Sequence, residues 1–147
     1  MADHRPSFTR GMYSGVIHAS QLFPYPDPLD RSDPGETRVV RRLTDGLRDM
    51  RASGLVDPAR FDEEETIPED VIRAFAELGM LGLTIPKEYG GLGLSQTSYI
   101  RAMEMVTSKD GSLTALLSAH QSIGLPQPLK LFGTDEQKQR FFPRLAK

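Results

Sequence analysis

The chain has 147 residues, 38% of them hydrophobic, which gives room for one ordinary domain with one core. Its 18 basic and 20 acidic side chains leave a net charge of −2, so no global positive field attracts nucleic acid or an anionic membrane. The chain has no cysteine, which excludes disulfides, thiolate metal sites and cysteine nucleophiles.

The N-terminal residues 1–34 are predicted to precede the core as an extended, proline-rich segment. Residues 21–34 are rich in proline, which fixes φ and removes a backbone donor. Residues 1–20 lack the apolar stretch of a secretory signal, and Asp3 argues against a transit peptide, so the cytoplasm is the expected compartment. We therefore expect the folded domain to occupy residues 35–147.

The first predicted helix of the domain begins after Asp33 and ends near Gly54. Asp33, Pro34 and Glu36 supply a capping side chain, a proline for the first turn and a carboxylate near the positive end of the helix. Apolar residues then recur at helical spacing, with arginines on the other side. These apolar positions are Val39, Val40, Leu43, Leu47 and Met50.

The second predicted helix begins at a capping box formed by Thr66 and Glu69 and ends at Gly79. Its buried face is expected to consist of Val71, Ile72, Phe75 and Leu78.

The glycine-rich residues 80–94 are predicted to be irregular, and the run of glycines at 90–93 is interpreted as a turn between helices. No strand precedes it and the Lys-Ser/Thr pair of a phosphate-binding loop is missing. Ser95 is expected to cap a third helix, whose inner face includes Tyr99, Met103 and Val106.

No charged residue occurs between Gly111 and Leu129. Residues 111–124 of this stretch are predicted to form a fourth helix that is buried on all sides. A membrane span is the disfavoured alternative, because the stretch contains several Ser, Thr and Gln residues and is shortened by two prolines. His120 lies in this stretch without a second ligand at metal-binding spacing, so we interpret it as a hydrogen-bonded structural histidine.

Thr134 and Gln137 form a capping box for a last helix, in which Phe141, Phe142 and Leu145 are expected to pack. No stretch shows the sustained alternation of a strand, and no internal repeat is visible. The predicted fold class is therefore all-α, a helical bundle.

Four stretches together resemble the N-terminal region of acyl-CoA dehydrogenases. The resemblance covers roughly residues 67–146, and the Phe23-Pro-Tyr-Pro26 lead-in is similar to the very-long-chain and long-chain branch. The stretches are ELGMLGLTIP (77–86), EYGGLGL (88–94), AHQSIG (119–124) and LFGTDEQKQRFFPRLA (131–146).

The resemblance implies a flavin-dependent enzyme of fatty acid β-oxidation that converts fatty acyl-CoA to 2,3-enoyl-CoA. Such enzymes have an N-terminal helical domain, a middle β-barrel and a C-terminal helical bundle, so we expect this chain to end before the barrel. The resemblance also implies FAD in the complete enzyme, electron-transfer flavoprotein as partner, a homo-oligomer or a complementing chain, and the mitochondrial matrix in a eukaryote.

No catalytic, cofactor-binding or metal-binding residue is assigned, because the family's flavin-contact stretch and catalytic glutamate have no counterpart in this sequence. Capping and solvated positions explain Glu77, Glu88 and Glu104. We expect the chain alone to be inactive.

The resemblance also implies that residues 112–123 line the acyl-chain tunnel. Thr114, Ser118, Gln121 and Ser122 are the candidate pocket residues, because their separations of about 3 and 4 residues place them along one helical face. Small side chains there favour a long acyl chain, although they would equally permit close helix packing. The alternative function is a non-catalytic helical module that binds acyl-CoA or a partner protein.

Overall fold

The computed structural model describes residues 8–17, 19 and 33–147, which belong to two compact units, Met1–Ser32 and Asp33–Lys147. In the first unit the described residues include a short helix, α1 (Phe8–Tyr13). Residues 7–17 contain no proline, so a helical turn can form there, and the prediction of an extended segment was wrong at this point. The proline-rich residues 20–32 lie outside the described residues, and the domain boundary stays a prediction.

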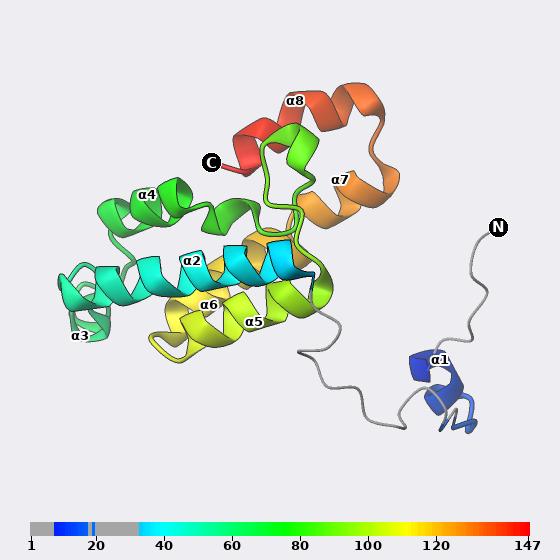
Figure 1. The fold of residues 1–147 in the computed structure, drawn as a ribbon, viewed down its shortest axis with the longest axis horizontal. Helices are drawn as coiled ribbons and strands as arrows, with labels where there is room; N and C mark the ends of the chain where they lie inside the picture. Colours follow the sequence, from blue (N-terminus) through cyan, green and yellow to red (C-terminus); the bar gives the residue numbers. More distant parts are fainter. Residues whose placement is uncertain (1–7, 18, 20–32) are drawn as a thin grey trace. The chain divides into compact units, whose positions relative to one another are not determined.

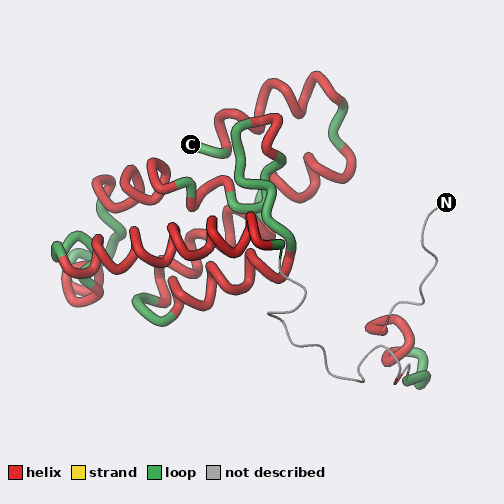
Figure 2. Tube along the Cα trace, in the orientation of Figure 1, coloured by secondary structure: helices red, strands yellow, loops and turns green. Residues whose placement is uncertain are grey.

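The second unit consists of helices joined by short connections, and the described residues contain no strand (Figures 1 and 2). This confirms the all-α fold class. No helix in the described part of the chain is long and apolar enough to cross a membrane. The helices are α2 (Pro34–Ala52), α3 (Pro58–Glu63), α4 (Glu69–Leu78), α5 (Gln96–Thr107), α6 (Gly111–Ser118), α7 (Pro126–Phe132) and α8 (Asp135–Leu145).

The long helix α2 forms for the local reasons that the sequence indicates. The Asp33 carboxylate accepts hydrogen bonds from the N–H groups of Gly35 (2.5 Å) and Glu36 (3.2 Å), which otherwise would have no partner in the helix. Leu43 and Leu47 are buried on its inner face, where α2 packs along α5. The predicted start, inner face and end of this helix are confirmed.

The start of α4 differs from the prediction. The helix begins at Glu69 after Pro68, and no side chain caps it, so the proposed Thr66 capping box was wrong. The fixed, extended backbone of Pro68 separates Thr66 from the first turn. The predicted end is confirmed, because Gly79 adopts the left-handed conformation at φ 92°.

Residues 80–94 fold back on themselves without forming an α-helix or a strand. Two short 3-10 turns, η2 (Met80–Gly82) and η3 (Lys87–Tyr89), lie on either side of a sharp bend. The returning chain is held by hydrogen bonds from Leu92 N to Gly82 O and from Leu94 N to Leu83 O, both 2.8 Å. The expected turn between helices is therefore confirmed, with the glycines inside it.

The core has two parts. The larger part lies among α2, α4, α5 and α6 and includes the fully buried Phe75. The smaller part joins α8 to the 80–94 turn through Ile85, Leu129 and Phe142, with the rings of Tyr89 and Phe142 5.0 Å apart. The predicted capping box of Thr134 and Gln137 at the start of α8 is present in both directions.

The uncharged stretch from residue 111 to residue 129 is not one helix. It contains α6, a π-helical turn, η4 (Ala119–Ile123), and α7. Its inner side is buried at Leu113, Leu117 and Gln121, whereas its outer side is open to solvent. The prediction of burial on all sides was therefore wrong for this chain, because no described element covers the outer side.

Candidate functional site

Of the four residues predicted to line an acyl pocket, Thr114 and Ser122 face α5, whereas Gln121 points to the 80–84 segment. Two of them meet hydroxyl groups of α5: Thr114 Oγ1 lies 3.0 Å from Thr107 Oγ1, and Ser122 Oγ lies 2.7 Å from Tyr99 OH. Ser118 is half-buried and Gln121 is fully buried. The prediction assumed an unbroken α-helix, and the π-turn, which inserts a residue, changes the direction of the later side chains.

Gln121 makes two hydrogen bonds to backbone that lies about forty residues earlier in the chain. Its Nε2 donates to Met80 O at 2.7 Å, and its Oε1 accepts from Thr84 N at 3.3 Å. With no exposed surface and both ends of its amide paired, this side chain holds the π-turn to the 80–84 segment.

The outer side of the same stretch forms a surface without charge, which we call the wall. The wall runs from α6 across the π-turn, and Ile123 at its end is 81% exposed. Ala115 and Ala119 also lie on this surface, and the sequence prediction did not name them, although they belong to the same uncharged stretch. The wall consists of Ser112, Ala115, Ala119, Ser122 and Ile123, all exposed.

His120 occupies a structural position beside the wall. Its Nε2 lies 2.8 Å from the carbonyl oxygen of Leu145, which ties the π-turn to the end of α8. Within residues 8–17, 19 and 33–147, no group of His, Asp or Glu residues is arranged to hold a metal ion. The carboxylates of Glu77, Glu88 and Glu104 belong to exposed residues.

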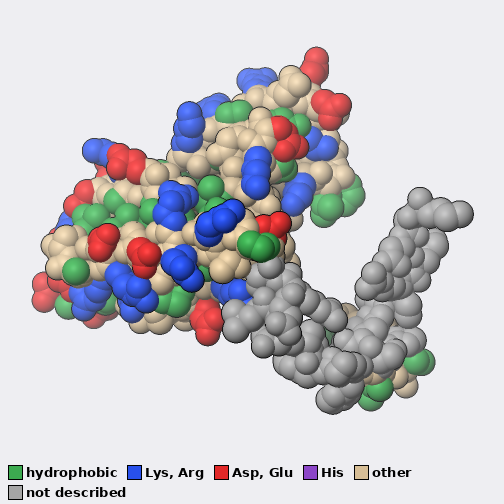
Figure 3. Space-filling model, viewed as in Figure 1, with side chains coloured by type: hydrophobic (Ala, Val, Ile, Leu, Met, Phe, Trp, Pro, Cys, Tyr) green, Lys and Arg blue, Asp and Glu red, His purple; other side chains and the backbone are tan. Residues whose placement is uncertain are grey.

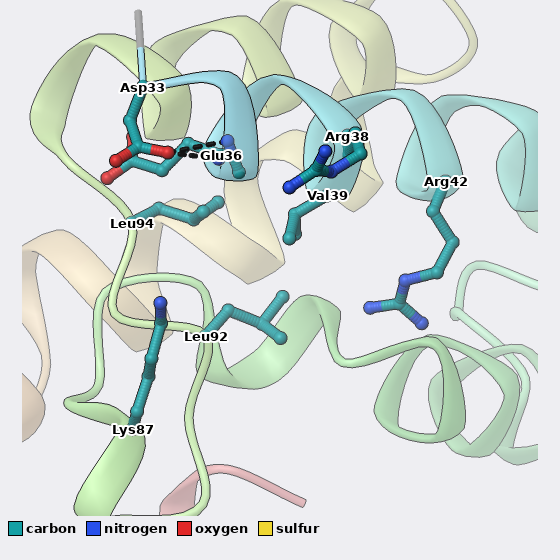
Figure 4. A pocket seen from close by; sticks show the side chains of 9 residues that line it. Asp33, Glu36, Arg38, Val39, Arg42, Lys87, Leu92 and Leu94 are labelled. Carbon is teal, nitrogen blue, oxygen red and sulfur yellow. Dashed lines mark hydrogen bonds between the residues drawn. The ribbon is translucent and has the colours of Figure 1, made fainter.

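A groove of about 420 Å³ lies between α2 and the 80–94 turn (Figure 4). Val39, Leu92 and Leu94 supply its apolar floor, and we call this surface the basic groove because of the cations at its edge. Arg38 and Arg42 project from α2, and Lys87 approaches from the opposite turn, as Figure 4 shows. The complete lining comprises Asp33, Gly35, Glu36, Arg38, Val39, Arg42, Lys87, Leu92 and Leu94.

Among the residues that the structure describes, the three cations of the basic groove form no ion pair, although Asp33 and Glu36 also line the groove. Among the described residues, no carboxylate lies within ion-pairing distance of Arg38, Arg42 or Lys87. The space-filling view shows Lys and Arg side chains gathered over α2 and the neighbouring turn (Figure 3). An anionic surface with a protruding apolar side chain would complement both the edge and the floor of this groove.

Glu36, at the end of the basic groove, joins α2 to the start of α5. Its carboxylate accepts hydrogen bonds from Ser95 N (3.1 Å) and from Ser95 Oγ (2.5 Å). Burial acts to raise the pKa of Glu36, but the hydrogen bonds from Ser95 and Ser98 outweigh it and hold the pKa below its usual value. Ser95 also caps α5 by accepting from Ser98 N, so the predicted cap is confirmed.

Replacing Glu36 with glutamine is expected to destabilise the chain by about 1 kcal/mol at pH 7. Because the folded pKa is lowered, the ionised carboxylate stabilises the fold above the unfolded pKa of about 4.3, and this contribution is lost as the pH falls through the folded pKa. Urea unfolding of both proteins from pH 7 to pH 3 should therefore show a difference that shrinks in acid. A difference that grew in acid would contradict the assignment.

Comparison with known proteins connects these features to one family. Residues 40–147 match the model of the acyl-CoA dehydrogenase N-terminal domain. The chain is 43% identical over 142 residues to the probable acyl-CoA dehydrogenase FadE10 of Mycobacterium tuberculosis, covering 97% of this chain and 21% of that protein. It is 37% identical over 140 residues to the human mitochondrial very long-chain specific acyl-CoA dehydrogenase, covering 95% of this chain and 21% of that protein.

A solved structure has a similar fold. It is described as "Electron transferring flavoprotein of Acidaminococcus fermentans: Towards a mechanism of flavin-based electron bifurcation", and one of its chains aligns with a TM-score of 0.66 and 28% identity. The alignment covers 79% of this chain and 30% of that chain. The chain spans about a fifth of the length of the curated relatives it matches. Since the family model covers most of its residues, the chain belongs to the acyl-CoA dehydrogenase family, whose N-terminal helical domain it contains.

Proposed function

We propose that this chain supplies one wall of the acyl-chain pocket in a flavin-dependent enzyme that oxidises fatty acyl-CoA to 2,3-enoyl-CoA. The observation that carries the proposal is the wall, an exposed surface on a stretch of 19 residues that contains no Asp, Glu, Lys or Arg. We call it the acyl wall from here on. Soluble proteins rarely leave such a surface uncovered, and an acyl chain together with the rest of the enzyme would cover it. Residues 35–147 would form the helical domain of that enzyme.

The wall is suited to an alkyl chain and not to the charged parts of a cofactor. Ala115 and Ala119 leave space beside α6, and Ile123 adds apolar surface at the π-turn. The wall has no cation for the pyrophosphate of FAD, so we place the flavin-binding residues outside the wall. When bound to the complete enzyme, FAD would accept the hydride from the β-carbon.

The complete protein that carries this chain is expected to retain a visible flavin band that palmitoyl-CoA bleaches. The 147 residues alone, mixed with FAD, are expected to show no bound flavin band. Absorption spectra before and after the addition of palmitoyl-CoA make both measurements. If the complete protein bound palmitoyl-CoA but no flavin, it would be the non-catalytic acyl-binding module instead.

A second surface supports a protein partner for the same enzyme. We propose that electron-transfer flavoprotein contacts the basic groove through an acidic part of its surface. The unpaired charges of Arg38, Arg42 and Lys87 would steer an acidic partner, and the apolar floor would receive one of its apolar side chains. Exposed Leu131 and Phe132 on α7 would be covered separately, by the rest of the enzyme or by another subunit of a homo-oligomer.

Reversing two charges of the groove with Arg38→Glu and Lys87→Glu is expected to slow association with electron-transfer flavoprotein about tenfold at low salt. The difference should shrink as salt screens the charges. Stopped-flow reoxidation of the substrate-reduced enzyme at several salt concentrations measures it. Arg48→Glu is the matched control, since Arg48 lies on the same helix, pairs with Asp45 and does not line the groove. An equal effect of the control would contradict the assignment.

A further inference from the structure

The Gln121 side chain occupies a position normally taken by a backbone hydrogen bond. Met80 O and Thr84 N are four residues apart, and in an α-helix they would bond to each other. Here the Gln121 amide lies between them, with Nε2 donating to Met80 O at 2.7 Å and Oε1 accepting from Thr84 N at 3.3 Å. The Gln121 amide therefore gives both backbone groups a partner in the η2 turn, which follows the end of α4 at Gly79.

The same side chain fixes the end of the acyl wall. Gln121 is the fully buried member of the π-turn, whereas the next two residues, Ser122 and Ile123, are exposed. Ser122 is also held from the other side by Tyr99 OH at 2.7 Å. Any shift of Gln121 would consequently move the backbone that carries Ser122 and Ile123.

The segment held by Gln121 also sets the floor of the basic groove. Residues 82–85 pair with the returning chain through Leu92 N to Gly82 O, Gly93 N to Ile85 O and Leu94 N to Leu83 O, each 2.8 Å. Leu92 and Leu94 line the groove (Figure 4). The buried side-chain amide of Gln121 thus connects the backbone that carries the wall to the segment that pairs with the groove floor.

We propose that Gln121 is a positioning residue that couples the acyl wall to the basic groove. A displacement at one surface, caused by an acyl chain or by a partner protein, is transmitted through its two hydrogen bonds to the other surface. The identity of the two ligands rests on the proposed function, whereas the coupling itself does not. In the enzyme, the coupling would report acyl-chain occupancy to the surface that receives the electron acceptor.

The coupling is tested in the 147-residue chain by methyl NMR, with the Ile123 δ1 methyl as the reporter of the wall. Leu92→Ala at the groove is expected to shift this signal in the wild-type background and to lose that effect in the Gln121→Met background. Leu55→Ala is the matched control, because Leu55 is a half-buried leucine that packs on the core but does not line the groove. It should leave the Ile123 signal unchanged in both backgrounds.

A second variant keeps the test decisive if Gln121→Met does not fold. Gln121→Leu keeps an apolar side chain in the buried site but lacks both the donor to Met80 O and the acceptor for Thr84 N, so it should also abolish the Ile123 response. The coupling is overturned if Leu92→Ala shifts the Ile123 signal equally in wild type and in the folded variant. It is also overturned if Leu92→Ala leaves that signal unchanged in wild type.

An experiment with added ligand tests the proposed function separately from the coupling. Palmitoyl-CoA added to the complete protein that carries the wild-type chain is expected to shift the methyl signals of Ile123 and Leu92, and in the Gln121→Met background only the Ile123 signal should move. If palmitoyl-CoA left the Ile123 signal unmoved, the assignment of the wall to an acyl chain would fail. The effect of Leu92→Ala on the Ile123 signal would then still test whether the two surfaces are coupled.

Discussion

Replacing Gly91 with alanine is expected to destabilise this chain by about 3 kcal/mol, because the new methyl group has no space. A Cβ at this position would lie 2.1 Å from Ile85 O and 2.6 Å from the carbonyl carbon of Ile85. These are backbone atoms of a residue buried in the smaller core, so they cannot move aside as the end of a flexible side chain could. The 80–94 turn would have to open, which would also move Leu92 out of the groove floor.

Chemical denaturation measures this effect as a lower midpoint at an unchanged m-value. Gly111→Ala is the matched control, because nothing lies within 4 Å of a Cβ there and Gly111 begins α6 without a left-handed backbone. Its stability should stay equal to that of wild type or rise by about 0.5 kcal/mol. A Gly91→Ala chain with the wild-type midpoint would show that the turn is not closed as the structure has it.

The parts of the fold that the sequence predicted are those fixed by neighbouring residues. Asp33, Ser95 and Thr134 each cap the helix that follows them, because a capping side chain needs only the N–H groups two or three residues later. The end of α4 at Gly79 is equally local, since it depends on one left-handed residue. Periodicity likewise indicated which sides of α2 and α5 are buried.

The parts that were wrong depend on contacts or competing signals beyond the local pattern. Thr66 has the spacing of a capping box, yet Pro68 begins the next helix in its place. The short helix α3 was missed, although Asp57 and Pro58 repeat the cap-and-proline signal of α2. The two hydrogen bonds of Gln121 join residues about forty positions apart. Helical periodicity carries no information about such a contact.

The candidate pocket shows the same distinction. The absence of charge drew attention to the stretch, and an assumed α-helical face selected Thr114, Ser118, Gln121 and Ser122, whose place in a pocket stays a prediction. In the structure Thr114 and Ser118 are half-buried. Ala115 and Ala119 are the small residues that face outward, because Leu113, Leu117 and Gln121 turn the opposite side into the core. The neighbouring elements decide which side of a uniformly uncharged helix is exposed. That arrangement depends on tertiary contacts, which the local sequence pattern does not contain.

Replacing Ala119 with phenylalanine is expected to lower the affinity of the complete enzyme for palmitoyl-CoA about a hundredfold. The affinity for butyryl-CoA should stay unchanged. Ala119 is exposed, so the larger side chain fits this chain without strain and would instead project into the proposed pocket. Each methylene excluded from an apolar site costs about 0.8 kcal/mol, so about four excluded methylenes cost roughly 3 kcal/mol, or about a hundredfold in affinity. A short acyl chain would not reach the obstruction.

Titration of the flavin band with acyl-CoA of increasing length measures the effect of Ala119→Phe. Ala52→Phe is the matched control, because Ala52 is an exposed alanine in the last turn of α2 and does not belong to the wall. It should leave every affinity unchanged. If Ala119→Phe lowered the affinities for butyryl-CoA and palmitoyl-CoA equally, the wall would contact the thioester end of the substrate or another subunit. An unchanged affinity for palmitoyl-CoA would remove the wall from the pocket, because a phenyl ring cannot share the space of the alkyl chain.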